Sequence, residues 1–177
     1  MEPHKSSPST EEHRESAENI RLRCAVLTCS DTRTEETDTS GGYIIKSLTA
    51  AGHEITAYQI VPDETGLVGT SIDTHLSNDV DVILINGGTG ISRRDVTYDV
   101  VAAKLEKTIP GFGELFRMLS WDEVGAASML SRATAGIVGR TLIFSMPGST
   151  NAVKLAVNKL LLPELRHLAW ELRRQEN

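Results

Sequence analysis

Short apolar runs alternate along the chain with longer stretches in which apolar residues recur at helical spacing, and this alternation constrains the fold more than any other feature. The runs suited to strands are Arg23–Cys29, Glu54–Val61, Asp81–Ile85 and Thr141–Phe144. Strands that alternate with helices are typical of an open, mostly parallel sheet with helices on both faces. The sequence therefore predicts an α/β fold with three layers, α/β/α.

Helical spacing marks the segments between these runs. One helix ends at Ala51, directly before Gly52, which suits a C-cap. In the C-terminal tract Pro163 interrupts an apolar stripe, so a kink or a new helix start is expected there. The predicted helices are Ser40–Ala51, Glu64–Ser77, two or three between Thr97 and Ala135, and a long tract from Thr150.

The length of 177 residues indicates one domain, and the composition disfavours several functional classes. The formal net charge is -6, from 18 basic and 24 acidic side chains, which disfavours nucleic acid as a partner. No apolar run is long enough to cross a membrane, and the first residues lack the apolar core of a signal peptide. We therefore expect a cytoplasmic protein that has no membrane partner.

The first 20 residues differ from the rest in composition. They contain five Glu against one Lys and one Arg, and Ile20 is their only large aliphatic residue. Such a segment buries too little apolar surface to offset the entropy lost on ordering. Residues 1–20 are therefore predicted to be a disordered polar tail, and residues 21–177 a single domain.

The two cysteines both fall on the first predicted strand. Cys24 and Cys29 are five positions apart, an odd number, so their side chains point to opposite faces of the sheet. At about 3.3 Å per residue they are also roughly 16 Å apart, too far for a disulfide or a shared metal ion. We expect two structural thiols.

Polar residues follow each predicted strand, at the edge where open α/β sheets bind ligands. If the strands are parallel, all these turns share one edge of the sheet. The residues concerned are Ser30 and Asp31, Asp38–Gly41, Asp63, Gly87–Gly90 with Arg93, Arg94 and Asp95, and Pro147–Thr150.

The turn after the third strand is the most informative of these. Its residues 87–90 read Gly-Gly-Thr-Gly, and three glycines in four positions let a backbone approach a ligand closely and turn its N–H groups outward. The guanidinium groups and the carboxylate at positions 93–95 suit a phosphate and its metal counter-ion.

Each motif also has a simpler interpretation. Asp38 and Ser149 are suited to capping a helix, although a helix N-terminus can equally hold phosphate. Asp63 is suited to a solvated turn, and Asp95 to an ion pair with Arg93 or Arg94. Alternatively, Asp63 and Asp95 at one sheet edge could hold Mg²⁺ together with substrate phosphates. The histidines show no metal-ligand spacing and are not assigned a role.

The segment Pro110–Met118 leaves two interpretations open. Its apolar residues fit the buried face of a helix, so packing is sufficient to explain them. The start, PGFGE, flanks an aromatic residue with glycines and adds an acid, which also suits a wall that recognises a heterocycle. In that second case Glu114 would accept hydrogen bonds from the ring.

Six segments in this order closely resemble the molybdenum cofactor biosynthesis protein B family (MoaB), a sister of the molybdopterin adenylyltransferases (MogA) and of the gephyrin G domain. The resemblance covers residues 21–174, and FRMLS and MPGST are typical of the MoaB branch. The segments are TCSDTRTEETDTSGGYI, IVPDE, INGGTGISRRDVT, PGFGELFRMLS, SRATAG and FSMPGST.

The resemblance implies a MogA/MoaB-like molybdopterin-binding fold and a reaction. Active members transfer AMP from Mg-ATP to the terminal phosphate of molybdopterin and release pyrophosphate. By position, Asp63 and Asp95 match the family's essential aspartates, which are assigned to catalysis and to Mg²⁺. Residues matching its binding segments are Asp38, Ser40, Gly87, Gly88, Thr89, Gly90, Arg94, Glu114, Ser131, Arg132, Pro147, Gly148 and Ser149. Of these, residues 147–149 match a nucleotide-contacting loop, while Glu114, Ser131 and Arg132 match the pterin side.

One departure and two alternatives qualify the activity. Tyr98 stands where the family often has proline, which bears on the rigidity of that loop. Some MoaB members lack adenylyltransferase activity and can lose the aspartate that matches Asp63, which this chain keeps. The alternatives are a non-catalytic molybdopterin carrier on the same fold and an unrelated nucleotide-binding α/β enzyme. The family also implies a homotrimer or homohexamer, with apolar residues of 112–119 and 160–172 as candidate subunit contacts.

Overall fold

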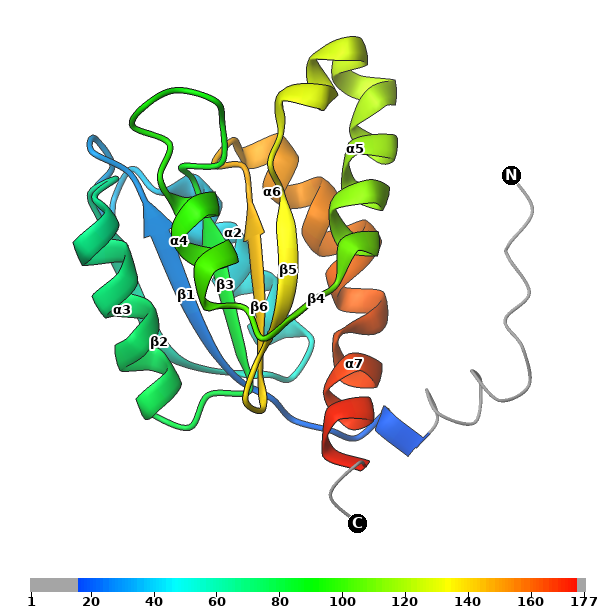
Figure 1. The fold of residues 1–177 in the computed structure, drawn as a ribbon. Coiled ribbons are helices and arrows are strands. Elements are labelled where there is room, and N and C mark those ends of the chain that lie inside the picture. The colour runs from blue at the N-terminus through cyan, green and yellow to red at the C-terminus, as the bar shows by residue number, and fades with distance from the viewer. Residues whose placement is uncertain (1–15, 175–177) are drawn as a thin grey trace.

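Six strands form one mixed sheet in the computed structural model, which describes residues 16–174 (Figure 1). Their order across the sheet is β2-β1-β3-β6-β5-β4. Neighbouring strands among the first four run parallel, whereas β5 pairs antiparallel with β6 and with β4. The strands are β1 (Arg23–Cys29), β2 (Glu54–Val61), β3 (Val82–Asn86), β4 (Lys107–Thr108), β5 (Thr134–Val138) and β6 (Thr141–Met146).

Helices cover both faces of this sheet, so the predicted three-layer α/β/α architecture is confirmed (Figure 1). The alternation of side chains along β3 separates two cores: Leu84 belongs to one and Ile83 to the other. The first core is closed by α2 (Thr39–Ala50), α5 (Pro110–Val124), α6 (Thr150–Ala156) and α7 (Leu162–Arg174), and the second by α3 (Thr65–Ser77) and α4 (Thr97–Lys104).

The expectation of helices as far as Ala135 is wrong at its C-terminal end. Helix α5 stops at Gly125, whose φ of +59° favours glycine, and a 3-10 turn, η1 (Gly125–Leu130), leads into β5. The pattern concealed this strand because Ala135 and Gly136 give it little apolar bulk. Gly136 itself has no room for a β-carbon, because the Lys107 carbonyl and the Leu105 side chain occupy that space.

The predicted interruption near Pro163 is present. A π-helical segment, Val157–Leu161, separates α6 from α7 and ends two residues before the proline. Proline has no N–H to continue the i→i−4 ladder, so a local change in helix winding before it is expected.

The two cysteines lie as the spacing predicts. Cys24 belongs to the first core and Cys29 to the second, and both thiols are free. Burial raises the pKa of each to about 12. Both are therefore protonated structural residues.

The predicted tail falls partly within the described residues. Residues 1–15 lie outside them, whereas Ala17 is only 1% exposed and the Ile20 carbonyl accepts a hydrogen bond from Arg166 Nε at 3.2 Å. Packing therefore begins a few residues before Arg21. Within residues 16–174, no helix has the length and apolar character needed to span a membrane.

Candidate functional site

The polar turns after β1, β2, β3 and β6 meet at one edge of the sheet, because these four strands are mutually parallel. Turn η1 lies at the same end (Figure 1). The antiparallel β5 leads away from this end, so Ser131 and Arg132, which precede it, also reach the edge. The shared edge expected from the sequence is confirmed.

Close backbone contacts hold the glycine loop Gly87–Gly90 at this edge. Gly87 has a φ of +101°, and its N–H donates to the Met146 carbonyl at 3.0 Å. The Cys29 carbonyl occupies the space that a β-carbon on Gly87 would need. A β-carbon on Gly148 would lie 3.1 Å from the Gly87 Cα. The loop is thus in direct backbone contact with the ends of β1 and β6.

Three carboxylates gather on one side of the loop. Burial, and next the Asp31 and Asp95 carboxylates, raise the pKa of Asp63, while the Arg94 charge lowers it. Arg94 Nη2 lies 2.6 Å from Asp31 Oδ2, so Arg94 pairs with Asp31 and not with Asp95. The Asp63 N–H donates to Asp31 Oδ1 at 3.2 Å.

The donor set around Asp63 fits a divalent cation. Asp63 Oδ1 and Thr97 Oγ1 are buried, and neither has a hydrogen-bond partner within residues 16–174. A cation would relieve both the unpaired oxygens and the mutual repulsion of the carboxylates. Across the same residues, no three His, Cys, Asp or Glu side chains are grouped to hold a metal ion. The remaining ligands would therefore be phosphate oxygens and water, as is usual for Mg²⁺.

Asp95 and Arg132 hold the Gly90 end of the glycine loop. Asp95 Oδ2 accepts from the Ser92 N–H at 2.8 Å, and the Asp95 carbonyl accepts from Arg132 Nη2. Arg132 Nε donates to the Gly90 carbonyl at 2.8 Å. The same guanidinium lies 4.8 Å from the centre of the Tyr98 ring, so the aromatic residue that replaces proline packs against this arginine.

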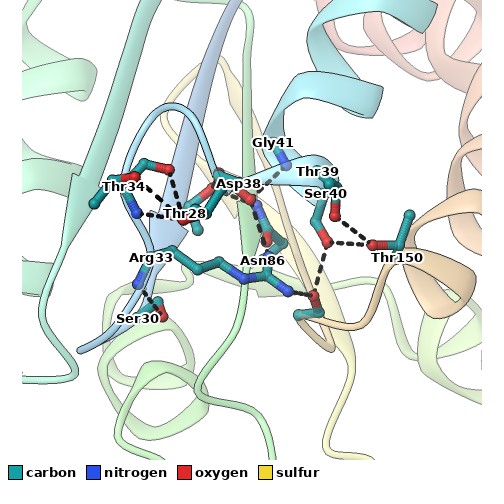
Figure 2. Close-up of polar contacts among 12 residues, drawn as sticks. Thr28, Ser30, Arg33, Thr34, Asp38, Thr39, Ser40, Gly41, Asn86 and Thr150 are labelled. Carbon is teal, nitrogen blue, oxygen red and sulfur yellow. Dashed lines mark hydrogen bonds and ion pairs between the residues drawn. The ribbon is translucent and has the colours of Figure 1, made fainter.

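Asp38 is a fully buried polar hub and not an exposed phosphate contact (Figure 2). Oδ1 accepts from the Gly41 N–H and from Arg33 Nη1, at 3.0 and 2.9 Å. Oδ2 accepts from Thr28 Oγ1 and the Tyr58 hydroxyl, at 2.5 and 2.8 Å. Burial raises the pKa of Asp38, but the accepted hydrogen bonds and the Arg33 charge outweigh it, and the pKa lies below its ordinary value. The helix-cap interpretation of Asp38 is confirmed.

The start of α2 is tied to the loop before α6. Ser40 Oγ donates to the Gly148 carbonyl at 2.8 Å, and Thr39 and Thr150 share a hydroxyl hydrogen bond at 2.8 Å (Figure 2). Ser149 caps α6 by accepting from the Ala152 N–H at 3.3 Å. Side-chain hydrogen bonds therefore join residues 38–41 and 147–150 into one unit.

A cavity of about 700 Å³ opens beside this unit, between the glycine loop, the end of α5, η1 and the start of α6. It brings together five of the predicted site residues: Thr89, Gly90, Ser131, Pro147 and Ser149. A second cavity, of about 440 Å³, is lined by Tyr98, Glu114, Arg117, Ser131 and Arg132, among others. The expected pterin wall is thus divided: Glu114 and Arg132 face the second cavity, and Ser131 borders both. Asp63, Asp95, Asp38, Ser40, Gly87, Gly88, Arg94 and Gly148 line neither.

Sequence reasoning missed Arg33 and Tyr58, which complete the Asp38 hub. Arg33 Nη2 donates to the Gly148 carbonyl at 2.7 Å, across 115 positions of sequence. The only signal for Arg33 is its place, five residues before a helix cap. Tyr58 comes from the middle of β2 and gives no signal.

Comparison with known proteins identifies a family whose match covers most of the chain. Residues 25–167 match the family described as "Probable molybdopterin binding domain". The molybdenum cofactor biosynthesis protein B of Bacillus cereus is 52% identical over 169 residues, which cover 94% of this chain and 99% of that protein.

Solved structures agree with the sequence match. A crystal structure of a molybdenum cofactor biosynthesis protein B is 53% identical, covers 88% of this chain and 98% of its own, and has a TM-score of 0.84. The tungsten cofactor synthesizing protein MoaB from Pyrococcus furiosus is 37% identical, with coverage of 86% and 98% and a TM-score of 0.79. Sequence and fold together establish that the chain belongs to the molybdenum cofactor biosynthesis protein B family.

Proposed function

We propose that this protein binds molybdopterin and adenylylates it with Mg-ATP, giving adenylyl-molybdopterin and pyrophosphate in the cytoplasm. The observation that carries the proposal is one juxtaposition. The glycine loop Gly87–Gly90 lies against the carboxylates of Asp63 and Asp95, and its residues Thr89 and Gly90 line the 700 Å³ cavity. This arrangement is suited to phosphoryl chemistry, in which close backbone donors and a cation neutralise developing charge.

The reaction needs no side-chain nucleophile. An oxygen of the terminal molybdopterin phosphate attacks the α-phosphorus of ATP, a new P–O bond forms, and the bond to the pyrophosphate oxygen breaks. The attacking phosphate is already anionic, so the protein has to position two anions and reduce their repulsion. Mg²⁺, held by Asp63 and Asp95, would supply that neutralisation.

The other residues divide by position. Thr89 and Gly90 of the glycine loop line the 700 Å³ cavity, as do Pro147 and Ser149 of the loop before α6. We assign this cavity to the phosphates and the nucleotide. The second cavity, with Glu114 as acceptor, suits the pterin. Arg132 also lines it, with its charge paired to Asp99 at 2.9 Å. Ser131 borders both, where the two substrates would meet.

One observation favours the non-catalytic carrier as the second candidate. Asp63 Oδ1 faces inward, toward Gly88 and Thr97, and neither Asp63 nor Asp95 lines the 700 Å³ cavity. A carrier would use the cavities without recruiting a metal ion to these carboxylates.

The exposed apolar surface of α5 and η1 supports the proposed homotrimer or homohexamer. Six large apolar residues there are 46–77% exposed. Single exposed apolar residues are normal on a protein surface, whereas several close together are typical of a contact surface. They are Leu115, Met118, Trp121, Val124, Met129 and Leu130. The second predicted contact, residues 160–172, packs its apolar side chains on the first core and is a weaker candidate.

The test combines purified protein, molybdopterin, ATP and Mg²⁺, with chromatographic quantification of the adenylylated product. Asp63→Asn and Asp95→Asn should abolish product, and both should unfold at the temperature of the unaltered chain. Asp73→Asn is the matched control, because Asp73 is an exposed aspartate of α3 whose carboxylate pairs with Lys104 Nζ at 2.6 Å. Pterin binding without product in the unaltered chain would establish the carrier instead.

A further inference from the structure

Arg33 bridges two segments that lie far apart in the sequence. From the connection between β1 and α2, its Nη1 reaches Asp38 Oδ1 at 2.9 Å and its Nη2 reaches the Gly148 carbonyl at 2.7 Å (Figure 2). Its side chain is 26% exposed. One guanidinium therefore joins the cap of α2 to the loop before α6.

Several contacts besides Arg33 hold the Asp38 end of this bridge. Asn86 Nδ2 donates to Thr28 Oγ1 at 2.8 Å, and Thr28 donates in turn to Asp38 Oδ2. A β-carbon on Gly41 would overlap Asp38 Oδ2, so the helix backbone lies directly against the carboxylate. Apart from Arg33, three donors hold the Asp38 carboxylate in place, so Arg33 meets a preformed acceptor.

The Gly148 end of the bridge lies next to the cavity. The Gly148 carbonyl accepts both from Arg33 Nη2 and from Ser40 Oγ, at 2.7 and 2.8 Å. Gly148 packs against the Gly87 backbone. Ser149, the next residue, lines the 700 Å³ cavity. A shift of the Gly148 carbonyl therefore displaces one wall of the cavity and one neighbour of the glycine loop together.

We infer that Arg33 is a positioning residue of this site, which holds the Pro147–Thr150 loop where it contacts the nucleotide. The inference rests on the proposed function for the identity of the ligand. Arg33 does not line the cavity, so it acts through Gly148 and not on the substrate. The role requires a planar fork with two donors at a fixed angle, which the single ammonium of lysine does not supply.

Variants at this position separate positioning from folding. Arg33→Ala should raise the KM for Mg-ATP by about tenfold, with a smaller change in kcat, because a displaced loop weakens nucleotide contact. The KM of Arg33→Lys should lie between those of the unaltered chain and Arg33→Ala, since lysine can reach one acceptor but not both. Added guanidinium ion should restore part of the lost activity to Arg33→Ala. Arg21→Ala is the matched control, because Arg21 forms an exposed ion pair with Glu54 at the other end of the sheet.

Amide hydrogen exchange gives a readout that is independent of turnover. Residues 147–153 should exchange faster in Arg33→Ala than in Arg21→Ala, with exchange in β1 and β3 unchanged. If the unaltered chain makes no product, the proposed function fails, and faster exchange of this segment still supports the bridge. Unchanged exchange in Arg33→Ala, or a KM for Mg-ATP equal to that of Arg21→Ala, would overturn the inference.

Discussion

The carbonyl oxygen of Cys29 stands where a β-carbon on Gly87 would have to be. Gly87→Ala should therefore destabilise the fold by at least about 3 kcal/mol, since the contact is with backbone and the φ of +101° is itself unfavourable for alanine. Gly42→Ala is the control: it lies in α2 with nothing within 4 Å of a new β-carbon, and should stabilise by roughly 0.5–1 kcal/mol. Urea unfolding of the two variants measures both effects, and equal free energies would contradict the packing described for Gly87.

Asp38 should be among the polar residues that contribute most to stability. Asp38→Ala removes a helix cap and leaves the partly buried Arg33 without its carboxylate, at a cost of about 3 kcal/mol. Its pKa lies below the ordinary 3.8, so this stability is fully present above that pH and is lost as pH falls through the lower folded value. Urea unfolding at pH 7 and in acid should show a smaller pH dependence for Asp38→Ala. The same acid sensitivity in both proteins would exclude the carboxylate as its source.

Protonation of His75 should lower the stability of the fold at a pH closer to neutral than protonation of Asp38 does. His75 is 4% exposed, and within residues 16–174 neither ring nitrogen has a hydrogen-bond partner. Burial lowers the pKa of His75 in the folded chain below the ordinary 6.5. Between that lowered pKa and pH 6.5, the unfolded chain binds a proton at His75 and the folded chain does not. The contribution of His75 to stability is therefore fully present above pH 6.5 and declines as the pH falls toward the folded pKa. His75→Leu should raise the free energy of unfolding by about 1 kcal/mol at neutral pH and more at pH 5.5. His53, whose pKa is lowered too, leaves some pH dependence in the variant.

Asp31 should shift the acidic limb of the activity profile through its effect on the pKa of Asp63. Burial and the neighbouring carboxylates raise the pKa of Asp63, whose ionised form is the one proposed to hold Mg²⁺. Asp31→Asn removes one of these charges, so activity should persist to lower pH. The asparagine can still accept from the Asp63 N–H. The pH dependence of kcat/KM for Mg-ATP across pH 4.5–8 reports groups of the free protein and tests this, and an acidic limb that does not move would show that Asp63 does not govern it.

The apolar surface of α5 and η1 should be the subunit contact. Met118 is 59% exposed, and Met118→Glu would place an unpaired charge in that contact. The dissociation constant should rise at least about 100-fold, which corresponds to about 3 kcal/mol. Analytical ultracentrifugation over a range of concentrations measures this. Lys46→Glu, an exposed change on α2, should leave the assembly intact.

The parallel half of the fold could be predicted because each of its strands is an apolar run followed by a polar turn. β5 escaped prediction because Ala135 and Gly136 dilute its pattern. Because β5 runs antiparallel to β6, it starts at the edge that carries the polar turns and so brings Ser131 and Arg132 to it.

The site was less predictable than the fold because its pairings depend on loop conformation. Arg94 was expected beside Asp95 and pairs with Asp31, which follows another strand. Glu114 was expected in the same site as Thr89 and Gly90, but the phase of α5 directs it to the second cavity. Segment order and residue type indicate which residues approach the edge, and only the backbone decides which of them face one another.

Cys24 and Cys29 occupy opposite faces of one strand, so each thiol is enclosed by a different layer of helices. The chain consequently carries a native probe in each core. A thiol reagent added under mildly destabilising conditions reports which layer separates from the sheet first. Modification of Cys29 before Cys24 would assign that event to α3 and α4, and the reverse order would assign it to the layer of α2, α5, α6 and α7. The order in which the two cores open can thus be recorded from the unaltered sequence.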